Sequence, residues 1–422
     1  MTKFLTMITL LCASLAAQIQ PVNQVLQWNK TLLTIVRTPG AQPATIHPTR
    51  SFAIMHAAIY DAVNAIDGSH TPYLIHLTGV SPIASQEAAA SAAAHEVLVT
   101  LYPNFQATLD AQFQQSLTQP SSGDKTAGIR VGQTVADHIL ALRNNDGSSA
   151  QPPVFVFGSA PGDYQSTPPN FPAQPQFTHW SRVRPFALQQ ASQFRPAPPP
   201  SLTSEMYSDV FNEVKALGIV NSNAASADQA LTGRFWNGAI QNYWNEISQT
   251  AAEAHNLTTA QNARLFALLN LALADCVIAF YDAKYTYNFW RPVTAIRAAD
   301  TDDNSATVAD QNWLPEVGKT TPDPSYPGAH AVISAAAGTV LNSFFRSHRF
   351  DFKVTSEVMP GVERFFKSFS TAADEATFSR IFAGVHFRSD LTSGQQLGRE
   401  VAHFVIDNVL TRSDGVDEAD DN

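Results

Sequence analysis

The stretch Thr259–Tyr287 reads TAQNARLFALLNLALADCVIAFYDAKYTY and decides the fold. Its apolar residues recur at steps of three and four, which is the period of an α-helix rather than of a strand. The same period extends outward through the segments 51–66, 85–101, 107–143, 202–217, 227–253, 330–347 and 394–410. Alternating, β-branched strand patterns are almost absent. We therefore predict a mainly α fold in which the helices pack as antiparallel bundles.

A proline-rich stretch, 151–201, interrupts the helical pattern and holds 12 of the 26 prolines. Long irregular segments are uncommon in compact domains and are usually functional loops or linkers. This one also carries eight aromatic residues, too many apolar rings for a solvated linker. We expect a packed connection between two helical halves. The predicted layout is a signal peptide at 1–16, an N-terminal helical half at 17–150, the connecting segment at 151–201, a C-terminal helical half with the chemistry at 202–412, and an acidic tail at 413–422.

The first 16 residues, MTKFLTMITLLCASLA, have the pattern of a secretory signal: a lysine, an apolar run and a small-x-small cleavage site. We expect export to the periplasm or outside the cell; a buried N-terminal helix is the alternative. The two cysteines are Cys12 and Cys276, so a mature chain that has lost Cys12 cannot close an internal disulfide. No later segment has the roughly 18 uninterrupted apolar residues that a membrane span needs.

The formal net charge is -10, with 26 Lys and Arg against 36 Asp and Glu. An acidic protein repels polyanions on average, so nucleic acid and anionic membranes are not expected as partners. Average charge does not describe a single pocket, and a small anion remains possible as a ligand.

Two cations and four aromatic residues meet in the stretch KYTYNFWRP, residues 284–292. Lys284 and Arg291 are seven positions apart, nearly two helical turns. They would face the same side about 10 Å apart if the helix continues to Arg291 despite Pro292. Two cations among aromatic side chains suit a buried oxyanion. A basic stripe on a solvated helix face is the alternative.

The stretch PSYPGAH, residues 324–330, places a Pro/Gly turn in front of the apolar run 331–341. The start of a helix exposes backbone N–H groups and the positive end of the helix dipole, and both attract anions. His330 at that start can give or take a proton. A surface or packing role is the alternative for this histidine.

The stretch FSRIFAGVHFRSD, residues 378–390, contains a histidine and a carboxylate four positions apart. In a helix Asp390 could accept the second N–H of His386 and leave the other ring nitrogen as a nucleophile or metal ligand. Arg380 adds a planar donor fork for oxyanion oxygens. The alternative is that Asp390 pairs only with Arg388 on a surface helix.

Three patterns follow one another along the chain: Lys-x6-Arg-Pro, a Pro/Gly turn ending in His, and Ser-Arg-x5-His-x3-Asp. In this order they resemble the three signatures of one superfamily. It unites the vanadium-dependent haloperoxidases with the type-2 phosphatidic-acid phosphatases. The match covers roughly residues 275–398, and the triple order is far more specific than any one motif. The stretches 282–297 and 379–386 are most similar to the soluble haloperoxidase branch. The resemblance implies a fold of α-helical bundles.

The resemblance also implies a cofactor and substrates: vanadate, hydrogen peroxide and a halide. His386 would bond to vanadium with Asp390 behind it, and His330 would be the acid–base partner of an oxyanion oxygen. The residues implied to hold the oxyanion are Lys284, Arg291, Gly328, Ala329, Arg380 and His386.

The second motif departs from the family pattern, which is Pro-Ser-Gly-His, because this chain has Gly328 and Ala329 before His330. A hydrogen bond to a charged group contributes about 1.5–3 kcal/mol, so we expect weaker anion binding or a water in place of the hydroxyl. Asp323 lies where halide preference varies in the family, and a carboxylate there disfavours chloride oxidation. We therefore predict bromide rather than chloride.

Three functions stay open. The first is a vanadate-dependent haloperoxidase. The second is a soluble, exported acid phosphatase that acts on a small phosphate ester through a phosphohistidine on His386. The third is a catalytically inactive helical binding protein, which leaves the joint presence of the three motifs unexplained.

Overall fold

The structure is a computed structural model that describes residues 23–413. The predicted signal peptide at 1–16 lies outside the described residues, as does the predicted acidic tail at 413–422 apart from Ser413. The described residues form 13 α-helices, three short 3-10 helices and one two-stranded antiparallel sheet. The prediction of a mainly α fold is confirmed.

Helices follow one another along most of the described chain, and the two short strands come late in it. The α-helices are α1 (Gln24–Arg37), α2 (Pro48–Asp67), α3 (Gln86–Leu101), α4 (Gln106–Thr118), α5 (Lys125–Arg143), α6 (Glu205–Leu217), α7 (Ala227–Phe235), α8 (Ile240–Ala254), α9 (Thr259–Tyr287), α10 (Pro292–Arg297), α11 (Ala329–Phe345), α12 (Phe369–Phe382) and α13 (Arg388–Asn408). The 3-10 helices are η1 (Pro103–Phe105), η2 (Trp180–Arg182) and η3 (Ala299–Thr301), and the strands are β1 (Phe352–Thr355) and β2 (Glu363–Phe366).

Helix α9 is the central element, and its ends lie where the sequence pattern places them. Thr258 and Gln261 form a capping box at its start, and Asn288 ends it in the left-handed conformation with φ 47°. Among the described residues it is the one helix long and apolar enough to cross a membrane, but 94% of its apolar window is buried inside the protein. It is therefore the core helix of the fold.

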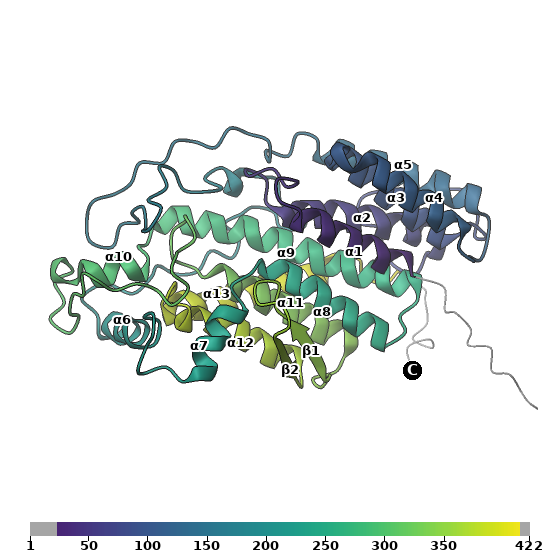
Figure 1. Ribbon diagram of the computed structural model, residues 1–422. Coiled ribbons are helices and arrows are strands. Elements are labelled where there is room, and N and C mark those ends of the chain that lie inside the picture. Colours follow the sequence, from purple (N-terminus) through teal and green to yellow (C-terminus); the bar gives the residue numbers. More distant parts are fainter. Residues whose placement is uncertain (1–22, 414–422) are drawn as a thin grey trace, which may run out of the picture.

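The other helices surround α9 on two sides (Figure 1). Helices α1, α2 and α3 contact one side, and α8, α11 and α13 contact the other. A single cluster of buried apolar side chains runs through both sides. The division into two helical halves, which this shared core does not test, stays a prediction.

Two helix pairs approach each other so closely that only glycine fits between them. A Cβ atom on Gly132 of α5 would lie 2.3 Å from the carbonyl oxygen of Ala89 in α3. One on Gly398 of α13 would lie 2.1 Å from the carbonyl oxygen of Val332 in α11. Because α11 and α13 both begin at the candidate site, this second close approach sets the geometry there.

Two of the long predicted helices are each divided, and these predictions are wrong in that respect. Segment 107–143 forms α4 and α5, because the turn between them contains Pro120 and Gly123, and Asp124 caps α5. Segment 227–253 forms α7 and α8, with a turn at 236–239. Helices α1 and α12 and the β1–β2 hairpin were not predicted.

The proline-rich segment 151–201 contains no α-helix and is held against α9 by two carboxylates. Asp275 accepts hydrogen bonds from the backbone N–H groups of residues 186–188 at 2.6–2.7 Å. Asp282 pairs with Arg195 at 2.6 Å. Acidic side chains of the core helix therefore fix this irregular segment in place.

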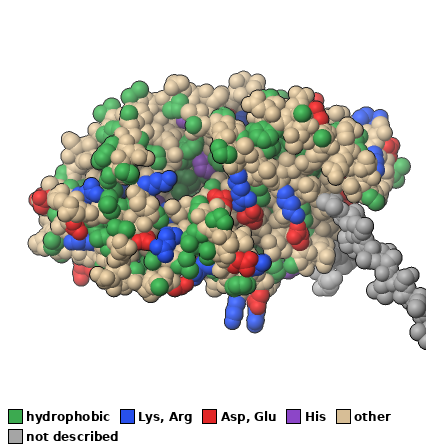
Figure 2. All heavy atoms as spheres, in the orientation of Figure 1, with side chains coloured by type: hydrophobic (Ala, Val, Ile, Leu, Met, Phe, Trp, Pro, Cys, Tyr) green, Lys and Arg blue, Asp and Glu red, His purple; other side chains and the backbone are tan. Residues whose placement is uncertain are grey.

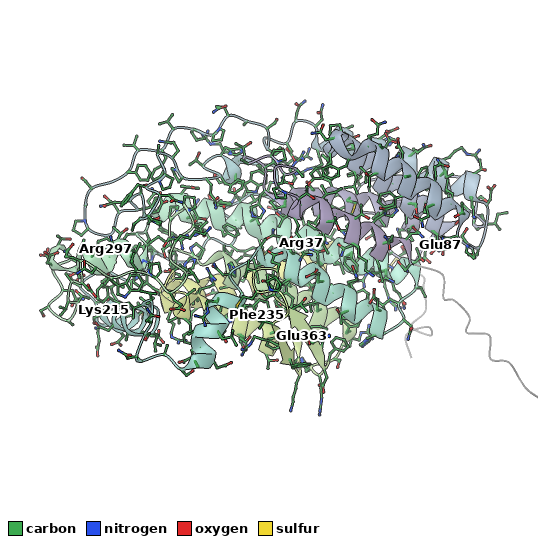
Figure 3. All side chains as sticks on the ribbon, in the orientation of Figure 1. Arg37, Glu87, Lys215, Phe235, Arg297 and Glu363 are labelled. Carbon is green, nitrogen blue, oxygen red and sulfur yellow. The ribbon has the colours of Figure 1, made fainter. Side chains whose placement is uncertain are left out.

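The loop between η3 and α11 carries the second sequence motif back to the end of α9. Side chains at the end of the molecule where α6 and α10 lie hold this loop (Figure 3). Lys215 Nζ donates to the carbonyl of Val308 at 2.6 Å, and Arg297 Nε donates to the carbonyl of Trp313 at 3.0 Å. The loop is thus anchored before it reaches the candidate site.

Candidate functional site

Lys284 and Arg291 reach the site from different elements. Lys284 lies in the last turn of α9, whereas Arg291 caps α10. The condition that one helix continues to Arg291 is not met, because Asn288 ends α9 and Pro292 begins a new helix. Both side chains are nevertheless buried and directed at the same carboxylate. The cations do come together, through a turn rather than through a shared helix face.

That carboxylate belongs to Asp323. Arg291 donates to it through Nη2, and Arg291 Nε donates to the Asp323 carbonyl at 2.8 Å. Lys284 Nζ lies 3.7 Å from the same Asp323 oxygen and donates to the carbonyls of Pro324 and Ser325. Burial lowers the pKa of Lys284, and the charge of Asp323 opposes this effect. These two cations therefore have a counter-ion supplied by the protein.

His386 and Asp390 are in contact, as the spacing predicts. Asp390 Oδ2 lies 3.1 Å from His386 Nδ1, although His386 precedes α13 and only Asp390 lies inside that helix. The same oxygen accepts from Ser325 Oγ at 2.6 Å and from the Phe387 N–H at 3.0 Å. Burial raises the pKa of Asp390 to about 6, and these hydrogen bonds oppose the rise. Because a carboxylate only accepts, Nδ1 carries the hydrogen and Nε2 keeps its lone pair.

The lone pair of His386 Nε2 faces Arg291. Arg291 Nη1 lies 3.0 Å from Nε2 and also donates to the carbonyl of Val385 at 2.8 Å. Burial and the charges of Arg291, Lys284 and Arg380 lower the pKa of His386 well below its ordinary value. The imidazole is therefore neutral, as a nucleophile or ligand requires.

Arg380 has buried donors with no acceptor. It lies in the last turn of α12 with 4% of its surface exposed, and Nη2 donates to Asn237 Oδ1 at 3.1 Å. Its Nε and Nη1 atoms are buried without a hydrogen-bond partner. Burial and the nearby charge of Arg291 lower the pKa of Arg380. An unpaired buried cation is costly, and an oxyanion would supply both the acceptors and the opposite charge.

His330 is the second residue of α11 and is half-buried. Its Nε2 atom lies 2.9 Å from the carbonyl oxygen of Trp236, which can only accept, so Nε2 carries the hydrogen. Burial and then the charge of Arg380 lower the pKa of His330 well below its ordinary value. Neutral His330 thus presents a lone pair on Nδ1 and can act as a base.

Gly328 and Ala329 form the start of α11. The N–H of Gly328 donates to the carbonyl of Asp390 at 2.9 Å, so it is not available to an anion. Ala329 is the first helical residue, whose N–H has no acceptor inside the helix. A Cβ atom on Gly328 would lie 2.7 Å from Leu391 Cδ2. Leu391 therefore occupies the space in which the serine of the family motif would begin.

A cavity of about 350 Å³ lies beside Arg380. Its walls come from four parts of the chain: the connecting segment, the turn after α7, the loop before α11 and, through Arg380, helix α12. The lining residues are Thr167, Pro168, Pro169, Asn170, Pro172, Asn237, Lys319, Thr320, Thr321, Pro322 and Arg380. Figure 2 shows a hollow on this face of the molecule, with hydrophobic side chains around it and a histidine visible inside.

His47 is a site neighbour that no sequence motif indicated. Its ring packs against Phe177 and Tyr281 with centroids 5.3 and 6.4 Å away. Burial lowers the pKa of His47 to about 3, and the charge of Asp323 opposes this shift. A residue from the N-terminal part of the chain thus borders the surroundings of Asp323.

Five of the predicted residues lie around the imidazole of His386: it is in contact with Asp390, and, besides burial, Arg291, Lys284, Arg380 and His330 all lower its pKa. The N–H of Gly328 is not available to an anion as predicted, because it donates a hydrogen bond to the carbonyl of Asp390. The alternative in which Asp390 pairs only with Arg388 is wrong, since Arg388 binds Glu213 at 2.6 Å. The arrangement defines a class of protein: a helical protein with three buried cations clustered beside two neutral histidines.

Comparisons with known proteins agree with this class. Residues 264–415 match the family model described as the VCPO second helical-bundle domain. Vanadium chloroperoxidase from Curvularia inaequalis is 24% identical over 499 residues, covering 89% of this chain and 80% of that protein. The first bacterial vanadium-dependent iodoperoxidase has a crystal structure that is 27% identical, with a TM-score of 0.76, covering 93% of this chain and 97% of that one. A holo-type bacterial vanadium-dependent chloroperoxidase, 15% identical, shares the fold with a TM-score of 0.70 over 91% of this chain and 97% of that one.

The chain therefore belongs to the superfamily of vanadium-dependent haloperoxidases and type-2 phosphatidic-acid phosphatases. Its site residues fit vanadate, because the unpartnered donors of Arg380 need oxygen acceptors. Among the described residues no group of three or more His, Cys, Asp or Glu could hold a metal ion.

Proposed function

We propose that this chain is a vanadate-dependent haloperoxidase that oxidises halide with hydrogen peroxide. The observation that carries the proposal is the buried pair of unpartnered donors on Arg380, next to a neutral His386 whose Nδ1–H is fixed by Asp390. The relatives named above, a chloroperoxidase and an iodoperoxidase, support the same activity.

In this proposal Lys284, Arg291 and Arg380 hold the vanadate oxygens, together with the N–H of Ala329. His386 Nε2 would be the ligand to vanadium, and Arg291 Nη1, which lies 3.0 Å from this ring nitrogen, would have to move away from it. When bound, vanadate supplies a Lewis acid that activates hydrogen peroxide toward halide.

The two histidines have separate tasks. Asp390 holds the Nδ1–H of His386, so the ring cannot turn and its other nitrogen stays directed at the anion. His330 is neutral and, with its hydrogen on Nε2, has a lone pair on Nδ1, so it would take a proton from the incoming peroxide and return it to the product. The Trp236 carbonyl fixes the tautomer that makes this possible.

We also propose bromide rather than chloride as the preferred halide. The Asp323 carboxylate contacts two cations of the site and so reduces the positive potential of the site. Chloride is harder to oxidise than bromide and needs the stronger electrophile, which a reduced potential disfavours. The sequence pattern at residues 1–16 supports export, so the reaction would take place in the periplasm or outside the cell.

The test is a pair of assays on the purified protein. The first follows bromination of a dione with vanadate, peroxide and bromide, with iodide and chloride in parallel. The second follows hydrolysis of an aryl phosphate without vanadate. We expect bromination that is lost in His386→Ala and retained in His403→Ala, an exposed histidine of α13. Phosphate release inhibited by vanadate, without halogenation, would instead identify a phosphatase. A protein that shows neither halogenation nor phosphate release would refute both the haloperoxidase and the phosphatase.

A further inference from the structure

The cations of the site differ in how far the protein itself satisfies them. Arg291 donates to the carbonyls of Asp323 and Val385 and to the Asp323 carboxylate, and it contacts His386 Nε2. Lys284 donates to two backbone carbonyls and lies 3.7 Å from the same carboxylate. Arg380 alone of these three cations keeps buried donors without a partner.

Only one of these partners of Arg291 and Lys284 carries a negative charge. The Asp323 carboxylate is 4% exposed and contacts Arg291 and Lys284, but it lies in a loop and belongs to neither helix that carries them. Its carboxylate gives these two cations a negative charge that belongs to the protein itself. It also holds Arg291 in the position where Nη1 contacts His386 Nε2.

We propose that Asp323 is a resident counter-anion that sets the charge selectivity of the site. Its carboxylate weakens the binding of any oxyanion, and it weakens a doubly charged one more than a singly charged one, because the repulsion is proportional to the ligand's charge. The inference rests on the proposed function, since it requires an oxyanion site around Arg380.

The charge of the ligand is the variable that separates this role from a structural one. Molybdate and perrhenate are both tetrahedral oxyanions, with charges of minus two and minus one. Removing the carboxylate in Asp323→Asn should tighten molybdate binding about tenfold and perrhenate binding about threefold, the square root of that factor. A loss of packing would change both affinities by the same factor. A displaced Arg291 would weaken both, and molybdate more than perrhenate, which is the opposite direction from the predicted tightening.

The experiment measures both dissociation constants by isothermal titration calorimetry on the full-length protein. Asp282→Asn is the matched control: it removes the same charge two residues before Lys284, but its carboxylate pairs with Arg195. We expect Asp282→Asn to bind both anions within twofold of the wild type. Equal changes for the two anions in Asp323→Asn, or no change, would overturn the proposal.

Removing Asp323 leaves two buried cations uncompensated, so the single variant can lose stability. The double variant Lys284→Met/Asp323→Asn keeps the buried charge balanced and is compared with Lys284→Met. The same unequal tightening is expected, and its absence overturns the proposal. If neither the wild type nor Asp323→Asn binds either anion, the proposed function fails as well. If wild-type binding is lost in Arg380→Ala yet unaffected by Asp323→Asn, only the counter-anion role fails.

Discussion

Restoring the serine of the family motif is a direct test of how this site differs from its relatives. Gly328→Ser places a Cβ atom 2.7 Å from Leu391 Cδ2, and Leu391 is fully buried. The leucine cannot swing into solvent, so the variant overpacks the site. We expect Gly328→Ser to lower the free energy of unfolding by about 1–3 kcal/mol.

The matching change is Leu391→Ala, which removes the obstacle. Alone, Leu391→Ala leaves a cavity and should lower the free energy of unfolding by about 2–5 kcal/mol. Combined with Gly328→Ser it should cost less than the sum of the single changes, because the serine fills part of the space. The new hydroxyl can then donate to a bound anion, a hydrogen bond of about 1.5–3 kcal/mol, or roughly 10- to 150-fold in affinity.

Urea unfolding measures the stability of the four proteins in this cycle, and calorimetry measures their affinity for orthovanadate. We expect the double variant to fold and to bind vanadate more tightly than the Leu391→Ala single variant. A Gly328→Ser variant as stable as the wild type would show that Leu391 does not occupy this space. A double variant with unchanged affinity would show that the missing hydroxyl does not limit anion binding.

Three further predictions concern stability. Burial lowers the pKa of His56 to about 3, so the unfolded chain gains a proton near pH 6.5 that the folded chain does not. Between pH 7 and pH 5 the wild type should lose about 2 kcal/mol more than His56→Gln in urea unfolding, and equal losses would contradict this. Asp275→Ala leaves the N–H groups of residues 186–188 unpaired. It should lower the free energy of unfolding by about 3–5 kcal/mol and speed hydrogen exchange at these residues. A decrease under about 1 kcal/mol would refute this role of Asp275. Gly398→Ala forces α13 away from the Val332 carbonyl and should lower the melting temperature by several degrees, whereas an unchanged value would show that the helices can separate freely.

Local signals explain which parts of the fold the sequence could predict. Helix α9 carries its own start signal at Thr258 and Gln261 and an unbroken apolar period, so its bounds were predicted. The break between α4 and α5 depends on Pro120 and Gly123, which the helical period on both sides obscured. Helix α12 has no strong amphipathic pattern, because it is buried against neighbours that lie far from it in the sequence.

The site shows the same limit. His386 and Asp390 are close in sequence, and their spacing led to the correct contact even though the backbone between them is not continuous helix. The partners that complete the site come from distant segments: Asn237 accepts from Arg380 across 143 positions, and His47 borders the site from the N-terminal part. Such contacts depend on tertiary packing, so no regular spacing of residues in the sequence indicates them.

We propose above all that Arg380 and its neighbours bind a small oxyanion. Titration of orthovanadate into the wild type, Arg380→Ala and Arg388→Ala tests it most directly, because Arg388 is a nearby arginine that pairs with Glu213 instead. Loss of two charge-assisted donors predicts at least about 100-fold weaker binding in Arg380→Ala and a change within about threefold in Arg388→Ala. Wild-type affinity in Arg380→Ala, or no vanadate binding by the wild type, would contradict the account.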